Sequence, residues 1–238
     1  MFDLGIMQPY FFPYLGYFAL IHRTRHWVVF DVVDYHSRHW MNRNRILEAV
    51  KGEQYITVAV DRSGGKKLNQ VRLAEKEASA SKILGQLRVY YKKAPFYEQV
   101  VEMVASVFAN AEGHLLRDLN ISCLRESCRY LGLKFECSIA SQSDYDFSGV
   151  SHAGQWALEI CAQRGASSYL NPVSGRNLFN LDDWNRRGIA IHFLEFETFE
   201  YDTHPRLPFR PMLSLIDVLM WNSREVVLAH LENSSEIY

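Results

Sequence analysis

The first 33 residues contain the pattern that most restricts the fold of this chain. Residues 4–7 are apolar, and a turn rich in proline and tyrosine leads into an apolar stretch that ends in basic residues at 22–25. Residues 27–33 then form a nearly continuous apolar run rich in valine. Basic residues suit the C-terminal end of a helix, and such a run is typical of a strand buried on both faces. Strand, helix and strand in this order predict a parallel βαβ unit.

The rest of the chain extends this unit around a helical middle. Residues 55–60, 134–139, 168–170 and 189–194 predict further strands, and residues 151–164, 182–187 and 214–221 predict helices. Between 78 and 131, apolar residues recur at helical spacing, with interruptions at Pro95 and Gly113. We expect one compact α/β domain with a Rossmann-like, mainly parallel sheet. It comprises an N-terminal βαβ part (1–77), a helical insertion (78–132) and a C-terminal part with closing helices (133–238).

Charge and hydropathy exclude several classes of function. The chain has 26 Lys+Arg against 27 Asp+Glu, so it lacks the basic surface that duplex nucleic acid requires. The apolar N-terminus carries Asp3 and is broken by Pro9 and Pro13, and no run approaches the roughly 18 apolar residues of a membrane helix. The four cysteines show no CxxC spacing, which indicates reduced and mostly buried thiols. We therefore expect a cytoplasmic protein that does not insert into membranes.

The loop after the first strand is one place to look for chemistry, because ligands of open parallel sheets bind beyond the carboxyl ends of the strands. This loop contains Gln8, Tyr10 and Tyr14, and Gly16 follows at the start of the helix. Two prolines restrict its backbone, and the helix N-terminus offers free N–H groups to an anion. The alternative is that the aromatic rings belong to the core and the prolines only shape a tight turn.

The segment after the second strand mixes acids, imidazoles, guanidiniums and amides. Its members are Asp31, Asp34, Tyr35, His36, Arg38, His39, Trp40, Asn42, Arg43 and Asn44. Such polarity at a strand end marks either a binding site or a solvated loop, and the large apolar ring of Trp40 favours a site.

The two histidines of this segment suggest two kinds of chemistry. His36 and His39 are spaced to ligate a metal, but no motif marks a third ligand and no HExxH sequence occurs. A histidine acting as general base, oriented by Asp31 or Asp34, fits the residue types better. We therefore predict no metal site here.

Three other loops carry cations or small residues. Ser174, Gly175 and Arg176 follow a predicted strand, where backbone N–H groups beside a guanidinium suit a phosphate or carboxylate. Lys92 lies between aromatic residues at a helix break, and residues 63–67 read Ser-Gly-Gly-Lys-Lys. The last loop lacks the spacing of a P-loop but still suits loose phosphate binding, and residues 149–152 lack the GxSxG nucleophile elbow.

Several of these segments together resemble the WbqC-like protein family of bacterial O-antigen and other surface-polysaccharide gene clusters. The resemblance rests on Gln-Pro-Tyr-Phe-Phe-Pro-Tyr-Leu-Gly-Tyr at 8–17, Asp31 with Trp-Met-Asn-Arg-Asn at 40–44, and Tyr-Lys with Ala-Pro-Phe at 91–96. Later landmarks are Ser-Gly-Arg at 174–176 and Asp217. The resemblance implies a role as a glycine transferase, which places an aminoacyl group on a sugar amine.

The first βαβ unit is also similar to that of the HIGH-type nucleotidyltransferases. In that superfamily an HxGH motif opens the helix and binds phosphate, whereas this chain has Tyr14-Leu15-Gly16-Tyr17. Tyrosines cannot supply cationic help to a leaving pyrophosphate, so the similarity extends to the fold better than to the chemistry.

The first hypothesis is a transferase that forms an amide on an amino sugar carried by a nucleotide. The acyl donor is a thioester, an adenylate or an aminoacyl-tRNA, so an acyl carrier protein is a candidate partner. His36 or His39 acts as base with Asp31 or Asp34, and the other residues bind substrate: Gln8, Tyr10, Tyr14, Trp40, Asn42, Arg43, Asn44, Lys92, Ser174, Gly175 and Arg176. The alternatives are an adenylate-forming or nucleotidyltransferase-like enzyme and a non-catalytic sugar-nucleotide-binding protein.

Overall fold

A computed structural model describes residues 1–233 and 235–238 and contains a six-stranded sheet in the order β10-β9-β8-β1-β2-β7. The strands are β1 (Phe2–Met7), β2 (Thr24–Val29), β7 (Cys137–Ile139), β8 (Ser168–Pro172), β9 (Ala190–Phe196) and β10 (Ser235–Ile237). All neighbours pair in parallel except β10, which runs antiparallel to β9. The predicted α/β class with a mainly parallel sheet is confirmed.

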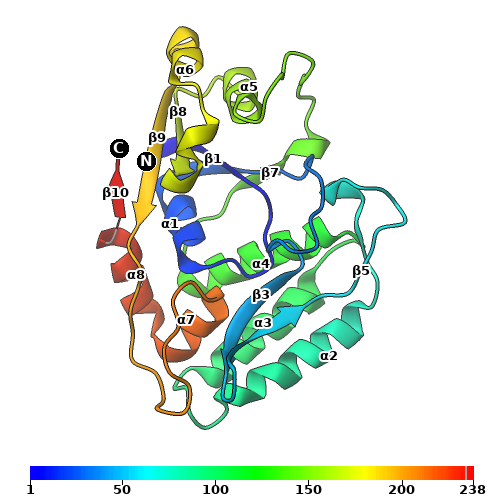
Figure 1. Cartoon of the computed structure of the whole chain (residues 1–238), viewed down its shortest axis with the longest axis vertical. Helices are drawn as coiled ribbons and strands as arrows, with labels where there is room; N and C mark the ends of the chain where they lie inside the picture. The colour runs from blue at the N-terminus through cyan, green and yellow to red at the C-terminus, as the bar shows by residue number, and fades with distance from the viewer. Residues whose placement is uncertain (234) are drawn as a thin grey trace.

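Side chains of the central strands alternate between two cores, as the period of a strand requires. Leu4, Ile6 and Val28 join a cluster on one face, which α5 and α6 cover. Trp27 and Val29 join the larger cluster on the other face, which contains residues of α1, α3, α4, α7 and α8. The sheet therefore has helices on both faces, as Figure 1 shows. This double cover explains why the second strand reads as a continuous apolar run.

Eight α-helices occur in the described residues. They are α1 (Leu15–Arg23), α2 (Lys76–Leu87), α3 (Tyr97–Asn110), α4 (Leu116–Leu131), α5 (Gln155–Gln163), α6 (Leu181–Arg187), α7 (Leu215–Trp221) and α8 (Arg224–Asn233). Helices α2, α3 and α4 form the helical insertion expected between residues 78 and 131. Short 3₁₀ turns follow α2 (η2, Arg88–Tyr90) and β8 (η4, Val173–Leu178).

Two expectations from the sequence differ from the structure, and one segment had no predicted element. The strand expected at 55–60 lies outside the main sheet, because β4 (Gly52–Thr57) pairs only with β3 (Arg43–Glu48) in a separate hairpin. The helix expected from residue 151 begins at Gln155 after Gly154, so no serine caps it. The polar C-terminus, to which the sequence assigned no helix or strand after residue 221, contains α8 and β10. Strand pairing and docking onto the sheet are tertiary events that local pattern does not record.

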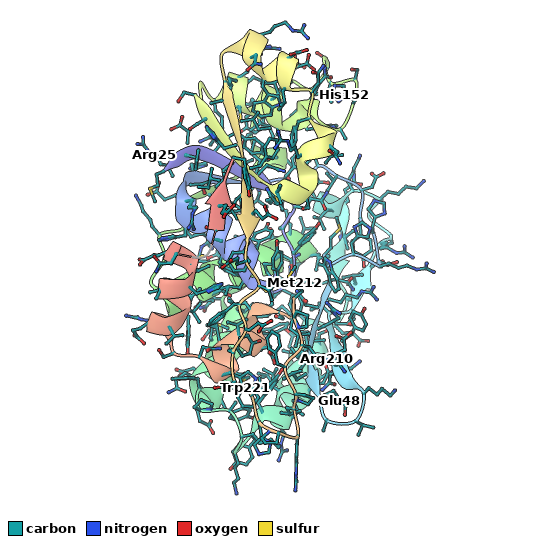
Figure 2. All side chains as sticks on the ribbon, turned by 60° about the vertical axis from the view of Figure 1, so that its left-hand side comes forward. Arg25, Glu48, His152, Arg210, Met212 and Trp221 are labelled. Carbon is teal, nitrogen blue, oxygen red and sulfur yellow. The ribbon has the colours of Figure 1, made fainter. Side chains whose placement is uncertain are left out.

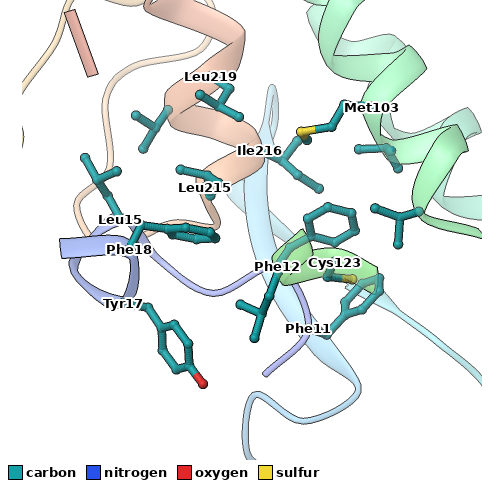
Figure 3. Packing of buried hydrophobic residues seen from close by; sticks show 14 of the residues in the cluster. Phe11, Phe12, Leu15, Tyr17, Phe18, Met103, Cys123, Leu215, Ile216 and Leu219 are labelled. Carbon is teal, nitrogen blue, oxygen red and sulfur yellow. The ribbon is translucent and has the colours of Figure 1, made fainter. Parts of the chain in front are cut away.

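The aromatic loop after β1 is partly core. Figure 3 shows Phe11 and Phe12 packed between α4, near Cys123, and α7, near Ile216. Both rings are fully buried and meet edge-on, with centroids 4.9 Å apart. Phe12 has a φ of 41°, which a non-glycine residue rarely adopts unless its surroundings hold it there. Its carbonyl oxygen accepts hydrogen bonds from Asn44 and from Ser214, which fix this strained turn.

Candidate anion-binding site at the carboxyl edge of the sheet

An inner network of buried polar groups lies at the carboxyl ends of β2 and β7. Asp31 is fully buried, and its carboxylate accepts hydrogen bonds from Arg117 at 2.8 Å, from the Ser141 hydroxyl at 2.6 Å and from the Ser141 amide at 2.9 Å. Arg117 comes from the first turn of α4 and also contacts Asp118. We assign Asp31 to joining β2, β7 and α4, because its oxygens are occupied inside the protein and do not contact either predicted histidine.

Two buried asparagines belong to the same inner network and hold the loops after β1 and β2 together. The Asn120 amide of α4 donates to the carbonyl oxygens of Pro9 at 2.8 Å and Met41 at 2.7 Å. The Asn44 amide donates to the carbonyls of Phe11 and Phe12, and its oxygen accepts from the amide of Arg45. Asn44 is therefore saturated by backbone groups and leaves little for a substrate.

The hydroxyls of the tyrosine-rich loop also turn inward. Tyr10 donates to the Gln8 side chain at 3.2 Å, and Tyr17 donates to the Gln8 carbonyl at 2.6 Å. The Tyr14 ring lies so close to Gly16 that a Cβ there would meet it at 2.4 Å. Tyr14 thus occupies space beside the first turn of α1, which does not favour the phosphate site of a HIGH-type motif.

A surface hollow of about 470 Å³ opens outside the inner network. It is lined by Asp34, Tyr35 and His36 of the loop after β2 and by Arg62, Gly65 and Lys66 of the loop after β5 (Val60–Asp61). We call this the cationic hollow, because three of its lining side chains carry or can carry positive charge. The loose phosphate loop at 63–67 and the polar segment at 31–44 therefore meet, which their sequence separation does not indicate.

The loop after β5, which forms one side of the cationic hollow, depends on a glycine for its turn. Gly65 has a φ of 145°, and a Cβ there would lie 2.0 Å from the side-chain oxygen of Gln70. That oxygen accepts from the Lys67 amide at 3.2 Å. Only glycine fits this turn. The turn presents Lys66 to the cationic hollow, while Lys67 pairs with Asp34 at 2.9 Å.

The predicted base candidates lie at the rim of the cationic hollow. The rings of His36 and His39 are 4.9 Å apart and both residues are exposed. The ion pair with Lys67 holds the pKa of the Asp34 carboxyl below its ordinary value, and the charge of His36 acts in the same direction. Asp34 therefore lines the same hollow as His36, whereas Asp31 is buried and does not.

Tyr35 connects the cationic hollow to the β3–β4 hairpin. Burial raises the pKa of the Tyr35 hydroxyl, and the charges of Arg62 and Arg43 oppose that rise. Arg43 donates to the Arg38 carbonyl at 2.7 Å and lies 4.5 Å above the Tyr55 ring. The predicted residue Arg43 thus contacts the loop that carries His36, through the Arg38 carbonyl.

Trp40 and Asn42, also predicted as substrate-binding residues, lie beside the hairpin. Trp40 stacks on Tyr55 with ring centroids 6.4 Å apart. Asn42 is buried and donates to the Val58 carbonyl at 2.9 Å, which leaves its side-chain oxygen without a hydrogen-bond partner.

The loop after β8 lies on the other side of β1. The turn at Ser174 and Gly175 packs onto Asn171, since a Cβ at Gly175 would meet the Asn171 amide nitrogen at 2.4 Å. The Arg176 guanidinium lies 5.3 Å from the ring centroid of Phe193, a residue of β9. The strand order reverses between β1 and β8. These residues follow β8 and lie toward β9, away from the loop after β2.

Lys92 does not join this edge of the sheet. It lies in the turn between η2 and α3, above the Tyr91 ring, where the amide of Phe96 donates to the carbonyl of Met220. Figure 1 places this turn at the far end of α2 from β5, so the helical insertion carries Lys92 away from the cationic hollow.

Sequence reasoning missed Arg117, Asn120, Tyr55 and Arg62. Arg117 and Asn120 had a detectable signal, because they lie among Leu116, Leu119 and other apolar residues of one amphipathic helix. A charged or amide side chain that shares the buried face of a helix must find a polar partner there. Tyr55 and Arg62 had no such signal in the sequence, because the packing of the hairpin and of the loop after β5 determines where their side chains lie.

In the described part of the chain, no group of three or more His, Cys, Asp and Glu residues is arranged to hold a metal ion. The same residues include no helix that is long and apolar enough to cross a membrane. The four cysteines are free thiols, of which Cys137 is half-buried and the others are buried.

Fold and site together define an α/β protein with a Rossmann-like, mainly parallel sheet and a cationic hollow beyond its carboxyl edge. The chain belongs to the WbqC-like protein family, whose model matches residues 8–228. It is similar to Rv1507c, an uncharacterized protein of Mycobacterium tuberculosis, with 25% identity over 218 residues that span 91% of this chain and 92% of that protein. No solved structure matches the chain significantly.

Proposed function

We propose that the protein is a transferase that forms an amide on a nucleotide-linked amino sugar in surface-polysaccharide biosynthesis, with glycyl as one candidate acyl group. The main support is the cationic hollow, in which the His36 imidazole lies with Arg62 and Lys66, and Asp34 lines the same hollow. A diphosphate matches the cations, and an amine next to it matches the imidazole. Family membership is compatible with this activity and does not specify it.

The chemistry requires one proton acceptor and one anion site. The amine nitrogen attacks the acyl carbon, and the new C–N bond forms as the bond to the sulfur or oxygen of the donor breaks. His36 accepts the proton that the amine loses, and Asp34 stabilises the resulting imidazolium. Arg62 and Lys66 hold the phosphates, so that the sugar amine lies at the His36 rim of the cationic hollow.

The test is product formation from a nucleotide-linked 4-amino-4,6-dideoxy sugar, with thioester, adenylate and aminoacyl-tRNA donors offered separately and the amide detected by mass spectrometry. His36→Ala should lower the rate about 10²- to 10⁴-fold, the usual range for loss of a general base. His114→Ala is the matched control, because His114 is also exposed but lies before α4, outside the cationic hollow.

Each result has a definite meaning. If His39→Ala slows the reaction and His36→Ala does not, the base is His39 rather than His36. If both variants keep the wild-type rate, neither is the base. If no donor yields an amide, the protein is not this transferase.

A further inference from the structure

A ladder of aromatic rings and guanidiniums lies on the β3–β4 hairpin, in which Tyr55 is exposed and the other members are half-buried. Arg45 of β3 lies 5.3 Å from the Trp40 ring centroid, Trp40 stacks on Tyr55, and Arg43 lies 4.5 Å above Tyr55. Tyr55 pairs directly with Arg45 across the two strands. We call these four residues, Arg43, Tyr55, Trp40 and Arg45, the stacking ladder.

The ladder is held rigidly from outside. The Arg45 guanidinium donates to both oxygens of Glu53 at 3.0 and 3.1 Å, and Arg43 donates to the Arg38 carbonyl. Figure 2 shows Arg210 near Glu48 at the turn of this hairpin, where a Cβ at Gly52 would meet the Arg210 guanidinium at 2.9 Å. Pinned guanidinium planes and rings lose little conformational entropy when a planar group stacks on them.

The ladder also continues the cationic hollow. Arg43 of the ladder donates to the carbonyl of Arg38, which lies two residues after His36 of the hollow. Tyr55 keeps 45% of its surface exposed, with Arg43 over its ring and Arg45 opposite it on the neighbouring strand. A partly exposed tyrosine ring flanked by arginines, next to a hollow lined by cations, matches one ligand chemistry: a planar heterocycle joined to phosphates.

We propose that the stacking ladder is the subsite for the base of a nucleoside diphosphate whose phosphates lie in the cationic hollow. This inference rests on the proposed function and adds how its nucleotide-linked substrate is recognised. The base stacks on the exposed part of the Tyr55 ring beside Arg43, and Arg62 and Lys66 bind the phosphates. Every base has a π-face, so stacking tolerates different bases. The site therefore selects a nucleotide over a free sugar and discriminates weakly between uracil and guanine.

The experiment is isothermal titration calorimetry of the full chain at about 0.15 M salt with UDP, GDP and inorganic diphosphate. Tyr55→Leu should lower the affinity for both nucleotides about tenfold, near the low end of the contribution of one stacked base. The affinity for inorganic diphosphate should change by less than about twofold. Tyr55→Phe should bind all three like the wild type, because it keeps the ring. Tyr91→Leu is the matched control, since Tyr91 is also 45% exposed beside a cation but lies on the helical insertion.

Three results would overturn the inference: wild-type nucleotide affinity in folded Tyr55→Leu protein, a wild-type preference above about hundredfold for one of the two nucleotides, or no nucleotide binding by the wild type. A single-stranded RNA hexamer that binds more than tenfold tighter than UDP would also overturn it, in favour of an RNA end. Tyr55-dependent nucleotide binding without any amide product would instead leave the inference standing and reject the proposed transferase. Amide product with nucleotide binding independent of Tyr55 would reject the inference alone.

Discussion

Asp31 and Asp34 lie in one loop, yet they belong to regions with opposite physical roles. Asp31 is in the inner network, where Arg117 and Ser141 use both of its oxygens and no surface is exposed. Asp34 borders the cationic hollow, is exposed, and pairs with a flexible lysine. Buried polar groups must be paired inside the protein, whereas exposed ones remain available to a ligand. The comparison separates polar groups that are used inside the protein from exposed ones, to which we assign the proposed binding.

The strongest test of this difference is to remove one partner of the buried Asp31–Arg117 ion pair. Arg117→Met should lower the free energy of unfolding by about 3–5 kcal/mol, because it leaves the buried Asp31 carboxylate without its counter-charge. Denaturant titration measures this loss. The double variant Asp31→Asn with Arg117→Met should recover part of it, since no buried charge remains. A loss below about 1 kcal/mol in the single variant would place this pair with the surface ion pairs instead.

A second buried carboxylate sharpens the comparison, because Asp217 has neutral rather than cationic partners. Tyr90 and Tyr201 donate to it, but burial prevails and raises the pKa of Asp217 to about 6. The folded state therefore holds this proton more tightly than the unfolded chain does. The resulting stability is present below the unfolded pKa near 3.9 and is lost as pH rises through about 6.

The measurement for Asp217 is the unfolding free energy of wild type and Asp217→Asn across this range. The wild-type value minus the variant value should fall by about 2 kcal/mol between about pH 4.5 and 7, and should then stay constant. Parallel curves for the two proteins would show that Asp217 does not titrate there.

The smallest expected effect on stability belongs to the cationic hollow. Lys66→Gln should change the unfolding free energy by less than about 0.5 kcal/mol, because Lys66 is exposed. The affinity of the Lys66→Gln protein for inorganic diphosphate at low salt should be several-fold lower than that of the wild type. Lys82→Gln, at an exposed position of α2, should change neither quantity. A large loss of stability in Lys66→Gln would erase the distinction between the two regions.

The parts of the fold that the sequence predicted are those with strong local periodicity. The βαβ unit, the three helices of the insertion and the strands β8 and β9 all lie near their expected positions. The separate β3–β4 hairpin and the C-terminal α8 and β10 were not predicted. Pairing partners and docking surfaces decide these elements, and neither is encoded in the spacing of apolar residues.

The candidate site likewise has a part that the sequence predicted and a part that it did not. The residue types of the loop after β2 indicated a polar site beyond a buried strand. His36 and Asp34 do line the cationic hollow, and Arg43 contacts the Arg38 carbonyl of the same loop. The same pattern could not separate Asp31 and Asn44, which the protein uses internally, from their exposed neighbours. Nor could it place Lys92 and Arg176, which the helical insertion and β9 hold elsewhere.

The sequence by itself determined the α/β class, the buried central strands and the family resemblance, because periodicity and motif are local properties of the chain. Only the tertiary structure decided which polar groups are saturated and which are free. Burial depends on what packs against a residue from distant segments: α4 brings Arg117 to Asp31, and the turn at Gly65 brings Lys66 to His36. These contacts between distant segments turn one polar loop into an internal support and an open site.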